Sequence, residues 1–285
     1  MENQVILVSG KNGQLGNELK DMADNYPQFE FHFFDRSELD IANAERINTA
    51  FEKYKPKYFI NTAAYTAVDK AETEQEQAYK INAEATGNIA KACKAYSTKL
   101  IHVSTDYVFN GQGTQPYKEN DATDPINYYG YTKLLGEQLA LQNNLQTIVI
   151  RTSWVYSVHG NNFVKTMLRL MKDRTDINVV ADQFGSPTYA KDLAEAIMQI
   201  ITQNNFQPGI YHFSNSGEIN WHTFAAAIKD AKHFLCNVHP IPTTQYPTPA
   251  KRPAYSVMSK EKIQSTFKVQ LKPWQQSLVE CLTHL

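Results

Sequence analysis

The sequence predicts an α/β fold in which helices cover both faces of a doubly wound parallel sheet, with a smaller C-terminal lobe beside it. Three observations support this prediction. Short apolar segments alternate with segments of helical periodicity up to residue 155, as in βαβ units. The apolar segments lack the polar alternation of a half-exposed strand, which indicates strands covered on both faces. After residue 155 the alternation weakens and proline-rich loops appear.

The alternation can be followed along the chain. Strands are predicted at residues 4–10, 29–35, 57–64, 99–105 and 146–156, and helices at 13–26, 43–54, 73–96 and about 126–143. Later helices are predicted at 161–173, 190–203 and 221–234, with loops at 182–189 and 239–255. We expect residues 1–155, plus parts of 156–240, to form the sheet domain. Residues 156–285 should contribute the smaller substrate-binding lobe, packed with the sheet domain as one unit.

Composition argues against several classes of protein. The formal net charge is -1 and there is no run of lysine or arginine, so nothing predicts nucleic-acid binding. No apolar stretch approaches the roughly 20 residues of a membrane span, and the first ten residues do not resemble a signal peptide. The cysteines, Cys93, Cys236 and Cys281, are far apart and odd in number. This pattern predicts a protein of the reducing cytoplasm.

A glycine-rich turn follows the first predicted strand. Gly10, Gly13 and Gly16 are spaced G-x-x-G-x-x-G and open the first predicted helix. Such a turn lets the backbone approach a pyrophosphate closely at a helix N-terminus. No Gly-Lys-Ser/Thr follows, which argues against a P-loop. A lone glycine motif is weak evidence, but this one has the required strand–turn–helix context. It predicts a Rossmann-type, NAD(P)-binding sheet domain.

The end of the second predicted strand bears on the choice of cofactor. Asp35 lies where an acidic residue commonly binds the ribose hydroxyls of NAD. Arg36 follows directly, and an arginine there can pair with the 2′-phosphate of NADP. A solvated surface charge is the alternative for Arg36. The sequence leaves NADH and NADPH both open.

The helix predicted at 126–143 contains a candidate catalytic pair. Tyr129 and Lys133 are one turn apart on the same face. A nearby ammonium lowers the pKa of a phenol, so we expect Lys133 to prepare Tyr129 for proton transfer while hydride moves to or from a carbonyl carbon. Ser104 and Thr105 end the fourth predicted strand, and a hydroxyl there can bond the same substrate oxygen. A strand-terminal cap is the alternative for Thr105.

Together these residues resemble the extended short-chain dehydrogenase/reductases. Finer strings narrow the resemblance to the dTDP-4-dehydrorhamnose reductase family within that group. They are NTAAYTAVDKAE (61–72), STDYVFNG (104–111), YYGYTKLLGE (128–137), RTSWVY (151–156), NNFVKTML (161–168), DQFGSPT (182–188) and KRPAYSVM (251–258). Seven strings in the same order over nearly the whole chain make the resemblance specific. Tyr131 departs from it, since many relatives have a smaller or charged residue there.

The resemblance implies an NAD(P)H-dependent reduction of the C4 keto group of dTDP-4-dehydro-L-rhamnose to dTDP-L-rhamnose. It implies three catalytic residues: Tyr129 as proton donor, Lys133 as its partner and as a ligand of the nicotinamide ribose, and Thr105 on the keto oxygen. The predicted cofactor site comprises Gly10, Asn12, Gly13, Gln14, Leu15, Gly16, Asp35, Arg36, Asp40, Ile41, Ala63, Ala64, Tyr65, Tyr129 and Lys133. The predicted substrate site comprises Thr105, Asp106, Tyr107, Trp154 and Arg252.

Several alternatives stay open on the sequence. Trp154 is also compatible with a core aromatic, and Arg252 with a surface charge. Similar sequences serve as the regulatory subunit of methionine adenosyltransferase, and other family members reduce other nucleotide-linked keto sugars. We predict no metal ligands, although a magnesium ion is associated with the dimer interface of some relatives. A homodimer is possible, and the expected partner is a small dTDP-sugar, with neither nucleic acid nor membrane.

Overall fold

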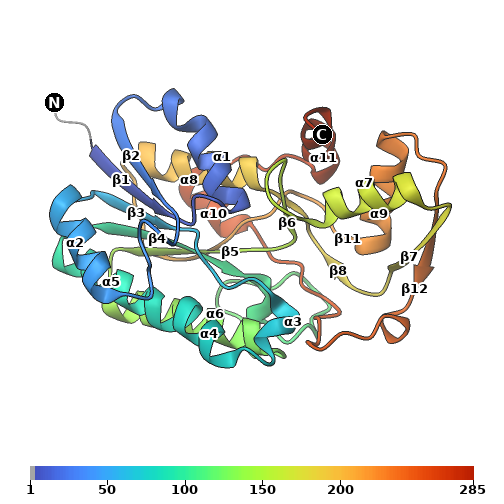
Figure 1. Cartoon of the computed structure of the whole chain (residues 1–285), viewed down its shortest axis with the longest axis horizontal. Helices are drawn as coiled ribbons and strands as arrows, with labels where there is room; N and C mark the ends of the chain where they lie inside the picture. The colour runs from blue at the N-terminus through green and yellow to red at the C-terminus, as the bar shows by residue number, and fades with distance from the viewer. Residues whose placement is uncertain (1–3) are drawn as a thin grey trace.

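The computed structural model describes residues 4–285 and is built around a six-stranded parallel sheet (Figure 1). The strands lie in the order β10-β5-β4-β3-β1-β2, and every neighbouring pair is parallel. Their bounds are β1 (Gln4–Ser9), β2 (Phe29–Phe34), β3 (Tyr58–Asn61), β4 (Lys99–Thr105), β5 (Thr147–Thr152) and β10 (Gly209–His212). The winding direction reverses between β1 and β3, the position where such sheets bind ligands. The predicted doubly wound α/β fold is confirmed.

Helices cover both faces of this sheet (Figure 1). On one face α1 (Gln14–Met22), α8 (Ala190–Thr202) and α10 (Glu261–Phe267) pack on one apolar core, which includes Ile6, Val8, Leu193 and Phe267. On the other face lie α2 (Ala44–Tyr54), α5 (Ala85–Ala95) and α6 (Tyr128–Asn143), with a core that includes Leu7, Phe51, Phe59 and Leu100. Burial on both faces explains why the strands are uniformly apolar.

A third core belongs to the smaller lobe, at the right of Figure 1. It packs α7 (Phe163–Asp173), α9 (Trp221–Ala231) and α11 (Trp274–Thr283) around residues such as Met167, Phe224 and Leu278. The lobe's short strand pairs are β6 (Val155–Tyr156) with β9 (Thr188–Tyr189), β7 (Asp176–Val180) with β12 (Asn237–Ile241), and β8 (Phe184–Gly185) with β11 (Ile219–Asn220). The segment 190–213 returns to the sheet domain, where it forms α8 and β10.

The structure corrects two predicted elements. The fifth strand does not run to residue 156 but ends at Thr152. The chain turns at Trp154, which adopts a left-handed backbone conformation with φ +48°. The helix predicted at 73–96 is α4 (Gln75–Tyr79), a π-helical turn (η2, Lys80–Glu84) and α5. The helices α3 (Val68–Ala71), α10 and α11, the 3₁₀ turns η1 (Ala23–Asn25), η3 (Asp106–Val108) and η4 (Thr243–Gln245), and the strands β7 to β12 were not predicted. Strands β8 and β9 and the end of β12 lie in segments predicted to be loops. Across residues 4–285, none of the helices combines the length and apolarity needed to cross a bilayer.

Candidate active site

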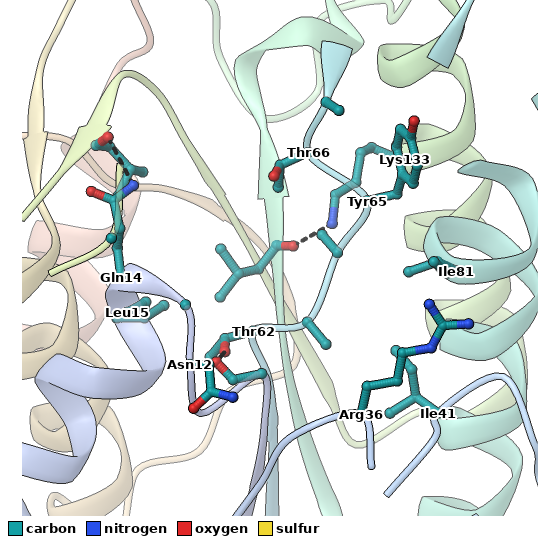
Figure 2. A pocket seen from close by; sticks show the side chains of 18 of the residues that line it. Asn12, Gln14, Leu15, Arg36, Ile41, Thr62, Tyr65, Thr66, Ile81 and Lys133 are labelled. Atoms are coloured by element: carbon teal, nitrogen blue, oxygen red, sulfur yellow. Dashed lines mark hydrogen bonds between the residues drawn. The ribbon is translucent and has the colours of Figure 1, made fainter. Parts of the chain in front are cut away.

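A cavity of about 690 Å³ lies at the carboxyl edge of the sheet, where the winding reverses. Loops after β1, β2 and β3 line it together with the end of β4 and one face of α6 (Figure 2). All the predicted cofactor residues except Gly16 are on its wall. Residues far apart in the chain, from Gly10 to Lys133, therefore meet in one cavity.

The glycine turn is shaped by close backbone packing. Gly10 has φ +79°, and a Cβ there would lie 2.8 Å from the backbone nitrogen of Ala63. A Cβ on Gly16 would lie 2.2 Å from the Gly10 carbonyl oxygen, so Gly16 supports the turn from behind rather than lining the cavity. Helix α1 starts at Gln14 with no side-chain cap and no acidic residue in its first turn. Its free N–H groups suit the pyrophosphate of a dinucleotide.

Asp35 and Arg36 differ in the hydrogen bonds and ion pairs that they form with other residues. One carboxylate oxygen of Asp35 accepts hydrogen bonds from the backbone and hydroxyl of Ser37, at 2.9 and 2.6 Å. Its other oxygen lies 3.4 Å from the Lys11 amine. Arg36 makes no hydrogen bond or ion pair with any residue in the described range 4–285. Figure 2 shows the Arg36 guanidinium directed into the cavity, on the side lined by Ile41 and Ile81. The free cation suits a phosphate there.

We expect Arg36→Ala to raise KM for NADPH at least about tenfold, because it removes an unpaired guanidinium that a 2′-phosphate can use. KM for NADH should change less than about threefold. Arg46→Ala is the matched control, since Arg46 is exposed and does not line the cavity. Steady-state kinetics with both cofactors decides the matter, and an equal loss for NADH and NADPH would show that Arg36 has another role.

Tyr129 and Lys133 both line the cavity, one turn apart on α6. The structure does not bear out the expectation that Lys133 lowers the pKa of Tyr129. Burial raises the pKa of Tyr129 to about 12, and the Thr105 side chain opposes this only in part. The Lys133 amine is turned toward β4 and donates to the Val103 carbonyl at 2.7 Å (Figure 2). Burial lowers the pKa of Lys133 to about 8, while Glu137 acts to raise it. At neutral pH the phenol therefore holds its proton, as a proton donor must.

Thr105 and Asp106 form a buried polar pair beside Tyr129. The Thr105 hydroxyl donates to Asp106 Oδ1 at 3.0 Å and caps η3 by accepting from the Tyr107 backbone. Asp106 Oδ2 is buried without a partner within residues 4–285. Burial raises the pKa of Asp106 to about 6. Ser104, the other hydroxyl considered, donates instead to Glu137 on α6. Both hydroxyls thus donate to buried carboxylates, and of the two residues Ser104 lines the cavity whereas Thr105 lies behind its wall.

The raised pKa of Asp106 makes stability pH-dependent. Since the folded value, about 6, lies above the ordinary value, 3.8, the native state binds the proton more tightly, and stability falls as pH rises from 4 to 7. We expect the wild type to lose about 1–3 kcal/mol of unfolding free energy through this group, and Asp106→Asn to escape that loss. Urea unfolding at pH 4.5 and 7.5 measures the difference, with exposed Asp124→Asn as control. Equal pH dependence in all three proteins would refute the assignment.

None of the predicted substrate residues, Thr105 and Asp106 included, lines this cavity. Trp154 stacks on Trp221, with ring centroids 3.6 Å apart, and packs against the core of the smaller lobe, which favours the alternative of a core aromatic. Arg252 forms a bidentate ion pair with Asp69 on α3, at 2.6 and 2.7 Å. This pair joins the loop 250–252 to the sheet domain. The Tyr107 ring meets the Tyr129 ring edge-on, with centroids 5.8 Å apart.

Sequence reasoning missed part of the cavity wall. Thr62, Thr66 and Ala67 flank predicted residues in the string 61–72 and were within reach of that motif. Gln77 and Ile81 come from α4 and η2, and Gly160 from the loop before α7, where no sequence signal marks them, whereas Asn161 opens the string 161–168. One group of side chains in the described range could offer metal ligands: Glu18, Asp21 and His159. The first already accepts from Ser157, and the other two pair with each other at 2.7 Å.

Comparisons with known proteins find relatives that match this chain over nearly its whole length. A family model described as RmlD substrate binding domain matches residues 4–285. The chain is 42% identical to a dTDP-4-dehydrorhamnose reductase from Aggregatibacter actinomycetemcomitans over 96% of both chains. It is 40% identical to the spore coat polysaccharide biosynthesis protein SpsK of Bacillus subtilis (strain 168), over 97% of this chain and 96% of that one. The crystal structure of a dTDP-4-dehydrorhamnose reductase from Bacillus anthracis in complex with NADP superposes with a TM-score of 0.96 at 37% identity, covering 99% of this chain and 100% of that chain. The chain belongs to the RmlD substrate binding domain family.

Proposed function

We propose that this protein uses NADPH or NADH to reduce the C4 keto group of dTDP-4-dehydro-L-rhamnose, giving dTDP-L-rhamnose. One observation supports it above the others: the glycine turn, Tyr129 and Lys133 line a single cavity at the switch point of the sheet. Relatives named dTDP-4-dehydrorhamnose reductase match nearly the whole chain, and one of them was crystallised with NADP. A bound nicotinamide cofactor supplies the hydride.

The chain's own residues have distinct tasks in this proposal. The free N–H groups at the start of α1 bind the pyrophosphate, and Arg36 faces the adenosine end. Tyr129, protonated at neutral pH, donates its proton to the oxygen that develops negative charge at C4. Lys133 stabilises the resulting phenolate as a buried cation, and Thr105 orients the keto oxygen. Burial of Thr105, Asp106 and Lys133 excludes water from this end of the site.

In this proposal Arg252 binds the diphosphate of the sugar nucleotide. Its ion pair with Asp69 fixes the guanidinium in position and leaves other N–H groups free to donate. We expect Arg252→Ala to raise KM for the dTDP-sugar at least about tenfold, roughly 1.4 kcal/mol, with Kd for NADPH unchanged within about threefold. Lys251→Ala, a change at an exposed neighbour, is the control. A loss of cofactor affinity without a change in sugar KM would move Arg252 to the cofactor site.

A substrate panel tests the proposed function. NADPH oxidation should be fastest with dTDP-4-dehydro-L-rhamnose among several nucleotide-linked 4-keto sugars. Faster turnover of another member would identify a different sugar or base, and no oxidation with any member would favour a binding role such as that of a regulatory subunit. We also propose a cytoplasmic location, in keeping with three buried free cysteines. Light scattering of the purified chain would decide whether it forms a homodimer.

A further inference from the structure

A buried ion pair lies beneath the catalytic helix and has no part in the roles described so far. Glu137 on α6 and Arg151 on β5 are exposed to only 1% and 2%. Arg151 Nε donates to both carboxylate oxygens of Glu137 at 3.0 and 3.1 Å, and Arg151 Nη2 donates to Oε2 at 2.7 Å. The guanidinium also lies over the Phe109 ring, 5.1 Å from its centroid. This is a fully formed, water-excluded charge pair.

Stability alone is a weak explanation for such a pair. Removing two charges from water costs several kcal/mol per ion, and well-packed apolar residues often stabilise a core equally well. The location of this pair is informative, because it adjoins the reactive end of the sheet. The Ser104 hydroxyl donates to Glu137 Oε1, and Thr105 is the next residue on β4. Arg151 is followed on β5 by Thr152, which lines the cavity.

The pair is coupled to Lys133 through α6. Glu137 is one turn beyond Lys133 on the same helix face. Lys133 donates to the carbonyl of Val103, and Glu137 accepts from the side chain of Ser104, the next residue. Helix α6 is thus bonded to β4 at two successive residues, and a buried carboxylate lies one helical turn from a buried ammonium.

We propose that Glu137, paired with Arg151, is a positioning residue for the reaction: it holds the Lys133 ammonium at the cavity wall and keeps it charged. The inference rests on the proposed function, since it assigns Lys133 a role in reduction. Removing the Glu137 charge alone would leave the Arg151 cation facing the lysine, whereas removing Arg151 alone would leave an unbalanced carboxylate there. The two changes should therefore shift the titration midpoint of Lys133 in opposite directions.

Few other titratable groups face Lys133. The buried and half-buried groups on the elements packed around this part of α6 are His102 on β4, Asp106 and Tyr107 on η3, and Tyr129 on α6 itself, and of these His102 interacts electrostatically with Lys133. Burial and Lys133 both lower the pKa of His102, so this imidazole is neutral. The charged side chains of α3, α4, η2 and α5, which also pack against α6, are exposed or, for Asp69, paired with Arg252. Glu137 is the group whose charge raises the pKa of Lys133 against the effect of burial.

The experiment titrates Lys133 directly, by NMR of the full-length chain with lysine labelled with ¹³C at Cε and the Lys133 signal assigned with Lys133→Arg. We expect Glu137→Gln to lower the Lys133 titration midpoint by about one pH unit and Arg151→Met to raise it by about half a unit. The double variant should fall between them. If one single variant fails to fold, the direction in which the Lys133 midpoint moves in the other variant still tests the inference. Midpoints that move the same way, or by less than about 0.3 unit, would overturn the inference.

A kinetic arm separates this inference from the proposed function. The wild type is first assayed with dTDP-4-dehydro-L-rhamnose, and absence of turnover refutes the function while leaving the NMR result valid. With turnover, the high-pH limb of the kcat profile should move down in Glu137→Gln and up in Arg151→Met, by the same amounts as the NMR midpoints. Gln138→Ala, a change at an exposed residue of α6 beside Glu137, should leave that limb in place. A limb that is identical in all variants would contradict the role of Glu137.

Discussion

Tyr129→Phe should lower kcat about 10²-fold or more while Kd for NADPH stays within about threefold of wild type. The change removes one hydroxyl from a partly buried ring and leaves the helix face, the Tyr107 contact and Lys133 in place. The hydroxyl is the proton source for the C4 oxygen, and its pKa of about 12 keeps it protonated throughout the working range of pH. Single-turnover kinetics together with a fluorescence titration of NADPH separates chemistry from cofactor binding.

Tyr131→Phe is the matched control, since Tyr131 is on the same helix but is 45% exposed and does not line the cavity. It should turn over at the wild-type rate. Normal turnover in Tyr129→Phe would refute the assignment of the proton donor. Equal losses in both variants would point to a disturbance of α6 rather than to lost chemistry.

Gly16→Ala should weaken NADPH binding about thirtyfold and destabilise the fold by about 1–3 kcal/mol. The new Cβ would lie 2.2 Å from the Gly10 carbonyl oxygen and 2.8 Å from Lys11 Cα, both backbone atoms that no rotamer change can move. Helix α1 must then shift away from the turn, and its N-terminal N–H groups leave the pyrophosphate position. Isothermal titration with NADPH and urea unfolding measure the two effects.

Gly13→Ala provides the comparison within the same motif. Its Cβ would meet only the Gly10 carbonyl oxygen, at 3.2 Å, and its φ of −78° suits any residue. The variant should keep the stability of the wild type within about 0.5 kcal/mol but lose cofactor affinity, because Gly13 lines the cavity. Equal stability losses in the two variants would show that the packing of Gly16 has no special importance.

Much of the sheet domain could be predicted because its signals are local. Strand β1, the glycine turn and α1 follow one another in sequence, so hydrophobic periodicity and glycine spacing specify them together. The same reasoning placed Asp35, Ala63 and Tyr65 on the cavity wall, since the carboxyl ends of parallel strands meet at one edge. Residues after a predicted strand are therefore the most predictable part of such a site.

What escaped prediction depends on contacts between distant segments. Trp154 ends β5 through its backbone conformation and its stacking on Trp221, and neither is encoded in the apolar pattern around it. Arg252 is paired with Asp69, which lies 183 residues away in the sequence. The pKa of Tyr129 was expected to be lowered by helix spacing to Lys133, whereas burial by other elements raises it. Burial and pairing are properties of the assembled fold.

The most direct test follows the hydride. The purified protein is incubated with dTDP-4-dehydro-L-rhamnose and NADPH carrying deuterium at the transferable position of the nicotinamide, and the sugar product is analysed by NMR and mass spectrometry. Two parallel samples, deuterated on opposite faces of the nicotinamide ring, cover either stereochemistry. We expect one sample to yield dTDP-L-rhamnose with a single deuterium at C4. Unreduced sugar in both samples, or reduced sugar without deuterium at C4 in both, would contradict it.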